Sequence, residues 1–174
     1  ARARRLTSGG SSWNHPVMSL RESAIDLVER LAADGHMALF AGGCVRDSLL
    51  NREPGDYDIA TSARPEQVEA LFPHTVAVGR RFGIVVVNHR EHSFEVATFR
   101  SDGNYLDGRH PEEVTFANAR ADSDRRDFTI NSMFEDPVAG KIIDYNNGRL
   151  DLEAGVIRAV GDPVKRFAED RLRM

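Results

Sequence analysis

The sequence predicts an α/β fold with a mixed, mostly antiparallel sheet and flanking helices. Three short apolar runs follow one another between residues 74 and 99, separated only by the connections GRR and HREH. Connections of this length suit antiparallel hairpins. Segments of helical period precede and follow these runs. With 174 residues, 41% of them hydrophobic and 29% charged, the chain is long enough for one domain with a sizeable core.

Order is expected to begin at Ser19. Residues 1–18 are rich in Arg, Ser and Gly and have no hydrophobic period, which predicts a flexible lead-in. Ser19 and Glu22 have the spacing of a capping box, so a helix should begin there and end at Gly35.

The remaining elements follow from periodicity and from turn residues. Strands are predicted at 37–42, 56–60, 74–78, 82–88, 93–99, 114–118 and 141–145, with a short extended piece at 156–160. Helices are predicted after Gly43 and at 64–72, 122–134, 148–155 and 162–174, and a long loop at 101–113.

Composition narrows the class of protein. The net charge of −4 argues against a globally basic nucleic-acid binder, although a local basic groove is compatible with it. The single cysteine, Cys44, excludes an internal disulfide framework and fits a reducing cytosol. No apolar run approaches the length of a membrane span, and no secretory signal is visible. We therefore expect a cytoplasmic protein without a membrane partner.

The first chemical motif is the glycine pair Gly42-Gly43, between a predicted strand and a predicted helix. Glycine lets the backbone come close to a ligand, and the free N–H groups at a helix start attract phosphate. Arg46 in the first helical turn supplies a charged donor for a phosphate group. A glycine pair is also a common turn, so this motif by itself is a weak signal.

Asp56 and Asp58 form the second motif. On a strand, residues i and i+2 point to the same face, and two like charges there gain little unless a cation lies between them. Mg²⁺ prefers such hard oxygen ligands and often completes its shell with substrate phosphates. Glu95, between Phe94 and Val96, is a candidate third carboxylate. An exposed turn for the aspartates, and the solvent face of an edge strand for Glu95, are the alternative interpretations.

A third group of polar residues lies in DSDRRDFTINSM, residues 122–133. In the predicted helix, Asp127 and Asn131 share one face, and Arg126 shares another with Asp122. A carboxylate and an amide can recognise ribose hydroxyls, and arginines can bind a triphosphate. A salt-bridged surface helix is the alternative. Near the end of the chain, Asp170 and Arg173 have the spacing of an ordinary helical ion pair.

Together these segments resemble the head domain of the class II tRNA nucleotidyltransferases. These enzymes share the DNA polymerase β-like nucleotidyltransferase fold with bacterial poly(A) polymerases. The resemblance runs in order over residues 37–174 and rests on GGCVRDSLL…GDYDIAT (42–61), EVATFR (95–100), DSDRRDFTINSM (122–133), DYNNGRLDLEAGVIRAVGDPVKRF (144–167) and EDRLR (169–173).

The resemblance implies a template-independent polymerase that adds CMP and AMP from CTP and ATP to the 3′ end of tRNA, with Mg²⁺ as cofactor. It implies that Asp56 and Asp58 carry the metal ions, with Glu95 as a third catalytic carboxylate. It assigns nucleotide binding to Gly42, Gly43, Arg46, Arg126, Asp127, Asn131, Asp170 and Arg173, the last two reading the base of the incoming nucleotide. It also divides the chain into a head domain at 19–160 and the truncated start of a helical neck at 161–174.

Two other functions fit the same motifs. A bacterial poly(A) polymerase would add AMP to RNA 3′ ends, although the loop at 101–113 resembles that of the CCA-adding enzymes and EDRLR lacks the proline associated with the polymerases. CC-only or A-only addition would use the same head. A non-catalytic nucleotide-binding or RNA-binding module should have lost part of its carboxylate set, and both Asp56 and Asp58 are present.

Overall fold

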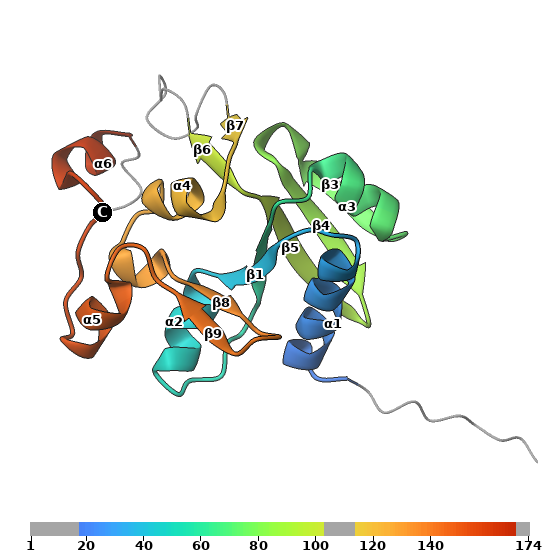
Figure 1. Cartoon of the computed structure of the whole chain (residues 1–174), viewed down its shortest axis with the longest axis horizontal. Helices are drawn as coiled ribbons and strands as arrows, with labels where there is room; N and C mark the ends of the chain where they lie inside the picture. Colours follow the sequence, from blue (N-terminus) through green and yellow to red (C-terminus); the bar gives the residue numbers. More distant parts are fainter. Residues whose placement is uncertain (1–17, 103–113, 170–174) are drawn as a thin grey trace, which may run out of the picture.

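A computed structural model describes residues 18–102 and 114–169, and Figure 1 shows how its elements are arranged. The helices are α1 (Leu20–Ala33), α2 (Gly43–Leu49), α3 (Pro65–Leu71), α4 (Ala119–Asp124), α5 (Gly148–Glu153) and α6 (Pro163–Glu169), with 3-10 turns η1 (Arg80–Phe82) and η2 (Thr129–Asn131). The strands are β1 (Ala38–Ala41), β2 (Asp58–Thr61), β3 (Thr75–Gly79), β4 (Ile84–His89), β5 (His92–Thr98), β6 (Arg100–Asp102), β7 (Val114–Phe116), β8 (Phe134–Asp136) and β9 (Lys141–Ile143).

Seven of these strands form one sheet in the order β3-β4-β5-β2-β1-β8-β9. Within this sheet β2 and β5 run parallel, and every other neighbouring pair is antiparallel. The hairpin β4–β5 closes through Arg90 and Glu91, as the short HREH connection predicts. The predicted mixed, mostly antiparallel sheet is therefore confirmed.

The two faces of the sheet bury different sets of residues. On one face α1 and α3 pack onto Phe40, Ile59 and Val96 in the larger core. On the other face Ala119 of α4 joins Leu39 and neighbouring residues in a smaller core. Figure 1 shows α1 and α3 to the right of the central strands, with α4, α5 and α6 to the left. Because Ile59 and Val96 belong to the larger core, the residues just before them in β2 and β5, Asp58 and Glu95, lie on the second face.

Helix α1 begins as the sequence predicts. The Ser19 hydroxyl accepts a hydrogen bond from the Glu22 N–H, and the Glu22 carboxylate accepts one from the Ser19 N–H, which completes the capping box. Cys44 is buried, and this burial raises the pKa of its thiol to about 11. It is a packed core residue.

Among the described residues, no helix is long and apolar enough to cross a membrane.

The predicted helix at 122–134 is wrong. Helix α4 ends at Asp124, Phe128 is extended, and the chain continues through η2 into β8. The reason is a long-range pairing: Asp127 O accepts from Val160 N at 2.9 Å, and Thr129 N donates to Arg158 O at 2.9 Å. These bonds replace the helical ones, and hydrophobic period cannot reveal them.

Smaller differences concern element bounds. The strand predicted at 56–60 begins at Asp58, so Asp56 precedes it. The loop predicted at 101–113 begins with part of β6. In the piece predicted as extended at 156–160, pairing is confined to the bridge between Phe128 and Ala159. The proposed lead-in lies outside the described residues except for Met18, and the proposed neck segment begins with the short helix α6.

Candidate active site

The turn before α2 needs a glycine at its first position. Gly42 has φ of +74° and ψ of −127°, a conformation that L side chains avoid. A Cβ on Gly42 would lie 3.0 Å from the Arg126 guanidinium, whereas one on Gly43 would meet only ordinary contacts. Gly42 N donates to Met133 O at 3.3 Å. The N–H group of Gly42 is therefore not free to bind a ligand. Its lack of a Cβ instead leaves room for the Arg126 guanidinium beside the backbone.

Asp58 and Glu95 lie on the same face of the sheet, on neighbouring strands. Each immediately precedes one member of the pair Ile59 and Val96, whose side chains point into the larger core on the other face. Part of Asp58 is open to solvent, yet the surrounding protein desolvates its carboxyl group. This desolvation, with the nearby carboxylates of Asp56 and Glu95, raises the pKa of Asp58 to about 6, and Arg126 opposes the shift.

The three carboxylates are therefore electrostatically coupled, but they do not form a complete metal site. In the described part of the chain, no three His, Cys, Asp or Glu side chains are grouped closely enough to hold a metal ion. Asp56 lies before the first residue of β2, and it is exposed like Asp58, whereas Tyr57 between them is buried in the larger core. Asp58 and Glu95 are the two carboxylates that the sheet places side by side.

Arg126, in the segment after α4, lies close enough to Asp58 for its positive charge to lower the pKa of that carboxyl group. Its guanidinium donates to Asp122 Oδ2 at 3.1 Å and to Asn131 O at 3.4 Å, and it lies over the ring of Phe134 at 5.1 Å. The Asp122 side chain is almost fully buried and also pairs with Arg125 at 2.8 Å. Asp122 therefore holds Arg126 in place, and its i, i+4 spacing from Arg126 in the sequence indicated this pair.

Arg46, Asn131 and Asp127 form a connected chain of hydrogen bonds. Arg46 Nη1 donates to Asn131 Oδ1 at 2.8 Å, and Asn131 Nδ2 donates to Asp127 Oδ1 at 3.4 Å. Asp127 Oδ1 also accepts from Phe128 N at 2.7 Å. The structure thus brings Arg46 from α2 together with residues from η2 and the segment before it. The shared helical face predicted for Asp127 and Asn131 is wrong, but the two residues are in contact.

Contacts from α5 and from Arg158 support η2, and we call these contacts the brace. The individual sequence motifs did not assign a function to these residues. Thr129 Oγ1 donates to Asp151 Oδ2 at 2.7 Å, and Arg158 Nε donates to the same oxygen at 2.9 Å. These bonds lower the pKa of Asp151. Gly148 packs so closely on the Thr129 carbonyl that a Cβ there would overlap it. The only sequence signal for this brace was the position of residues 144–167 in the resemblance.

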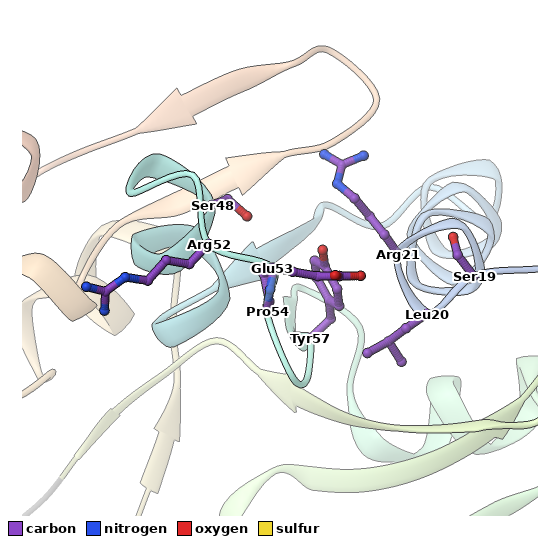
Figure 2. A pocket seen from close by; sticks show the side chains of 8 residues that line it. All are labelled: Ser19, Leu20, Arg21, Ser48, Arg52, Glu53, Pro54 and Tyr57. Carbon is purple, nitrogen blue, oxygen red and sulfur yellow. The ribbon is translucent and has the colours of Figure 1, made fainter.

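The described pockets do not coincide with these residues. The pocket in Figure 2, of about 440 Å³, lies between the start of α1 and the loop after α2. Tyr57 lines it and packs on Phe40 in the larger core, so the pocket opens on the opposite side of the sheet from Asp58.

Asp170 and Arg173, the predicted base-reading residues, lie outside the described residues.

A family model and several curated proteins match most of this chain. The family model described as "Poly A polymerase head domain" matches residues 38–158. The chain is 49% identical over 154 residues to a CCA-adding enzyme of Geobacillus stearothermophilus and 47% identical over 152 residues to one of Bacillus subtilis. These alignments cover 88% and 87% of this chain and 38% of each relative.

Solved structures show the same relation. The structure of the Bacillus stearothermophilus CCA-adding enzyme in complex with CTP superposes with a TM-score of 0.81 and 44% identity, over 90% of this chain and 38% of that one. A tRNA nucleotidyltransferase complexed with a primer tRNA and an incoming ATP analogue gives a TM-score of 0.67 at 30% identity, over 84% and 42% of the two chains.

The chain spans about 38% of the length of the curated relatives it matches. The matched family model covers all seven strands of the large sheet and all of the site residues that the structure describes. This chain therefore belongs to the family of poly A polymerase head domains, and its sequence and fold are similar to those of the CCA-adding enzymes.

Proposed function

We propose that this chain is the catalytic head of a CCA-adding tRNA nucleotidyltransferase. The proposed reaction transfers CMP and AMP from CTP and ATP to the 3′ end of tRNA, in the cytoplasm. In this proposal residues 19–160 form the head and residues 161–174 begin a helical neck. Relatives solved with CTP, with an ATP analogue and primer tRNA, and with tRNA support these substrates.

The observation that carries the proposal is the meeting of acidic and basic groups on one face of the sheet. Asp58 and Glu95 are adjacent there, and Arg126 faces Asp58 closely enough to oppose the rise in its pKa. Arg46, Asn131 and Asp127 join the same site through hydrogen bonds. Carboxylates beside arginines suit a reaction that binds a triphosphate and transfers a nucleotidyl group.

We assign Mg²⁺ to Asp56 and Asp58, with Glu95 as a further carboxylate. The donor set fits because all three side chains offer hard carboxylate oxygens. The raised pKa of Asp58 also fits, since a cluster of like charges is relieved by a bound cation. When bound, Mg²⁺ would neutralise triphosphate charge and favour ionisation of the attacking hydroxyl group.

The other assigned residues bind and orient the nucleotide. Arg126 and Arg46 present guanidinium groups to the phosphates, and Asp122 and Asn131 hold those groups in place. Asp127 accepts hydrogen bonds from ribose hydroxyls. Gly42 leaves room beside its backbone for the Arg126 guanidinium, because it lacks a Cβ at that place. Asp170 and Arg173 are proposed to read the base edge.

The second candidate function is poly(A) addition, which the name of the family model favours. One experiment separates the two. Full-length protein is incubated with a tRNA lacking its CCA end and with CTP, ATP, UTP and GTP, first singly and then mixed, and the products are sequenced. The expected products are CC with CTP alone and CC followed by a single A with the mixture. Long A tails support the polymerase, and no incorporation contradicts both proposals.

A further inference from the structure

The geometry points to Arg166 of α6 as a positioning residue for the nucleotide-binding segment 124–128, and this inference rests on the proposed function. Its guanidinium group reaches from α6 to the end of α4. Nη1 donates to Arg125 O at 3.3 Å, Nη2 donates to Asp124 O, and Nε donates to Val160 O at 3.0 Å. One side chain thus joins two separate stretches of backbone.

The carbonyl groups of Asp124 and Arg125, which Arg166 contacts, lie at the C-terminal end of α4. Asp124 is the last residue of α4 and Arg125 is its C-cap, so their carbonyl groups have no partner further along the helix. A cationic side chain satisfies such carbonyls and interacts favourably with the helix dipole. A planar guanidinium with several donors can contact two neighbouring carbonyls at once, which an ammonium group does less well.

Two further contacts fix the same segment to the C-terminal part of the chain. The ring of Phe167, next to Arg166, lies 6.5 Å from that of Phe128. Phe128 pairs with Ala159 in an isolated bridge. Phe167 thus ties α6 to the Phe128 side of this bridge, and the Arg166 contact with Val160 O ties it to the Ala159 side.

The segment held in this way carries the groups that face the nucleotide. Arg126 follows directly after Arg125, and its guanidinium lies where a Cβ on Gly42 would meet it at 3.0 Å. With so little free space, a shift of the α4 end moves Arg126 relative to Gly42 and Asp58. We infer that the position of α6 sets the affinity of the triphosphate site through Arg166, without Arg166 contacting the nucleotide.

The test compares three variants of the full-length protein: Arg166→Ala, Arg166→Lys and Lys165→Ala. Lys165→Ala is the matched control, because it removes a positive charge from the adjacent, exposed position of α6. Among the residues that the structure describes, Lys165 has no hydrogen bond or ion pair through its side chain. KM and kcat are measured for CTP and for ATP on tRNA lacking its CCA end. Thermal midpoints are recorded for all the proteins.

Arg166→Ala should raise KM for both nucleotides about tenfold and change kcat by less than about threefold, a size typical of lost charge-assisted hydrogen bonds. Arg166→Lys should recover part of the affinity, and Lys165→Ala should match the unaltered protein. A lower thermal midpoint with unchanged KM overturns the inference, because it indicates a purely structural role. An equal rise in KM for Lys165→Ala also overturns it.

Failure of the proposed function can be recognised separately. If the unaltered protein does not extend tRNA, CTP binding in the presence of Mg²⁺ is measured by calorimetry for the same set of proteins. Weaker binding by Arg166→Ala alone then supports the positioning role although CCA addition is contradicted. Equal binding by all variants, or no binding by the unaltered protein, overturns it.

Discussion

The two halves of the candidate site are held in place in different ways. The first half, from Gly42 to Asp58, lies on one turn, one short helix and the strand that follows, all close in sequence, and its long-range contacts are made to residues up to Met133. The second half, around Arg126 and Asn131, depends on contacts with residues 144–166, well beyond it in the chain. Changes in residues 144–166 should therefore affect the second half more than the first.

The largest expected effect belongs to the first half. Replacing both Asp56 and Asp58 with alanine should abolish nucleotide incorporation by full-length protein, a loss of at least about 10³-fold, because the proposed metal ligands are removed. The fold should persist, since both side chains are exposed. Radiolabelled CMP incorporation and circular dichroism measure the two properties. Undiminished incorporation would contradict the metal assignment.

The next largest effect tests the second half from a distance. Gly148→Ala should reduce the free energy of unfolding by about 3 kcal/mol, because the new Cβ overlaps the Thr129 backbone and forces η2 to move. Urea denaturation measures this change. Gly55→Ala is the control: a Cβ there meets nothing within 4 Å, so its effect should stay within about 0.5 kcal/mol. Equal stability of the two variants would remove the proposed dependence of η2 on α5.

Gly42→Ala tests the point where the halves meet. Its positive φ should cost about 2 kcal/mol of stability, and its Cβ should displace the Arg126 guanidinium and weaken CTP binding severalfold. Calorimetric titration with CTP and urea denaturation provide the measurements. Gly55→Ala is the control, because its φ is not positive and its Cβ meets nothing within 4 Å. If Gly42→Ala binds CTP with unchanged affinity, the close contact between Gly42 and Arg126 does not couple the two halves of the site.

The smallest effect concerns the ionisation of Asp151 in the brace. Hydrogen bonds from Arg158 and Thr129 lower the pKa of Asp151 below 3.8 in the folded protein. A lowered carboxyl pKa stabilises the fold at pH values above 3.8, and this contribution is lost as the pH falls through the folded value. Asp151→Asn should therefore lower the thermal midpoint at pH 7 and have a diminishing effect below about pH 4. A difference that stays constant with pH would exclude the ion pair with Arg158 as its source.

Much of the fold could be predicted because local signals agreed. Apolar period placed α1, α3 and the strands β3 to β5, and the Ser19 capping box placed the start of α1. The helix predicted over 122–134 failed because its backbone pairs with residues 158–160 instead. Periodicity reports which side chains are apolar, but it does not report which distant backbone groups compete for hydrogen bonds.

The residue types of the site were predictable for a related reason. Gly42, Arg46, Asp58, Glu95, Arg126, Asp127 and Asn131 were all singled out from the sequence, and the structure gathers them in one region. The chemistry of carboxylates, guanidinium groups and glycine is intrinsic to each residue, so short motifs carry it. The proposed base-reading residues, Asp170 and Arg173, lie outside the described residues and stay predictions.

The sequence by itself determined the fold class, the order of most elements and the kind of groups that the site contains. Only the tertiary structure decided which of these groups meet and what holds them. It placed Asp58 beside Glu95 through the parallel pairing of β2 with β5, and it assigned Gly148, Asp151 and Arg166 to the support of the second half. These contacts join residues far apart in the chain, and their energies depend on geometry that no local pattern records.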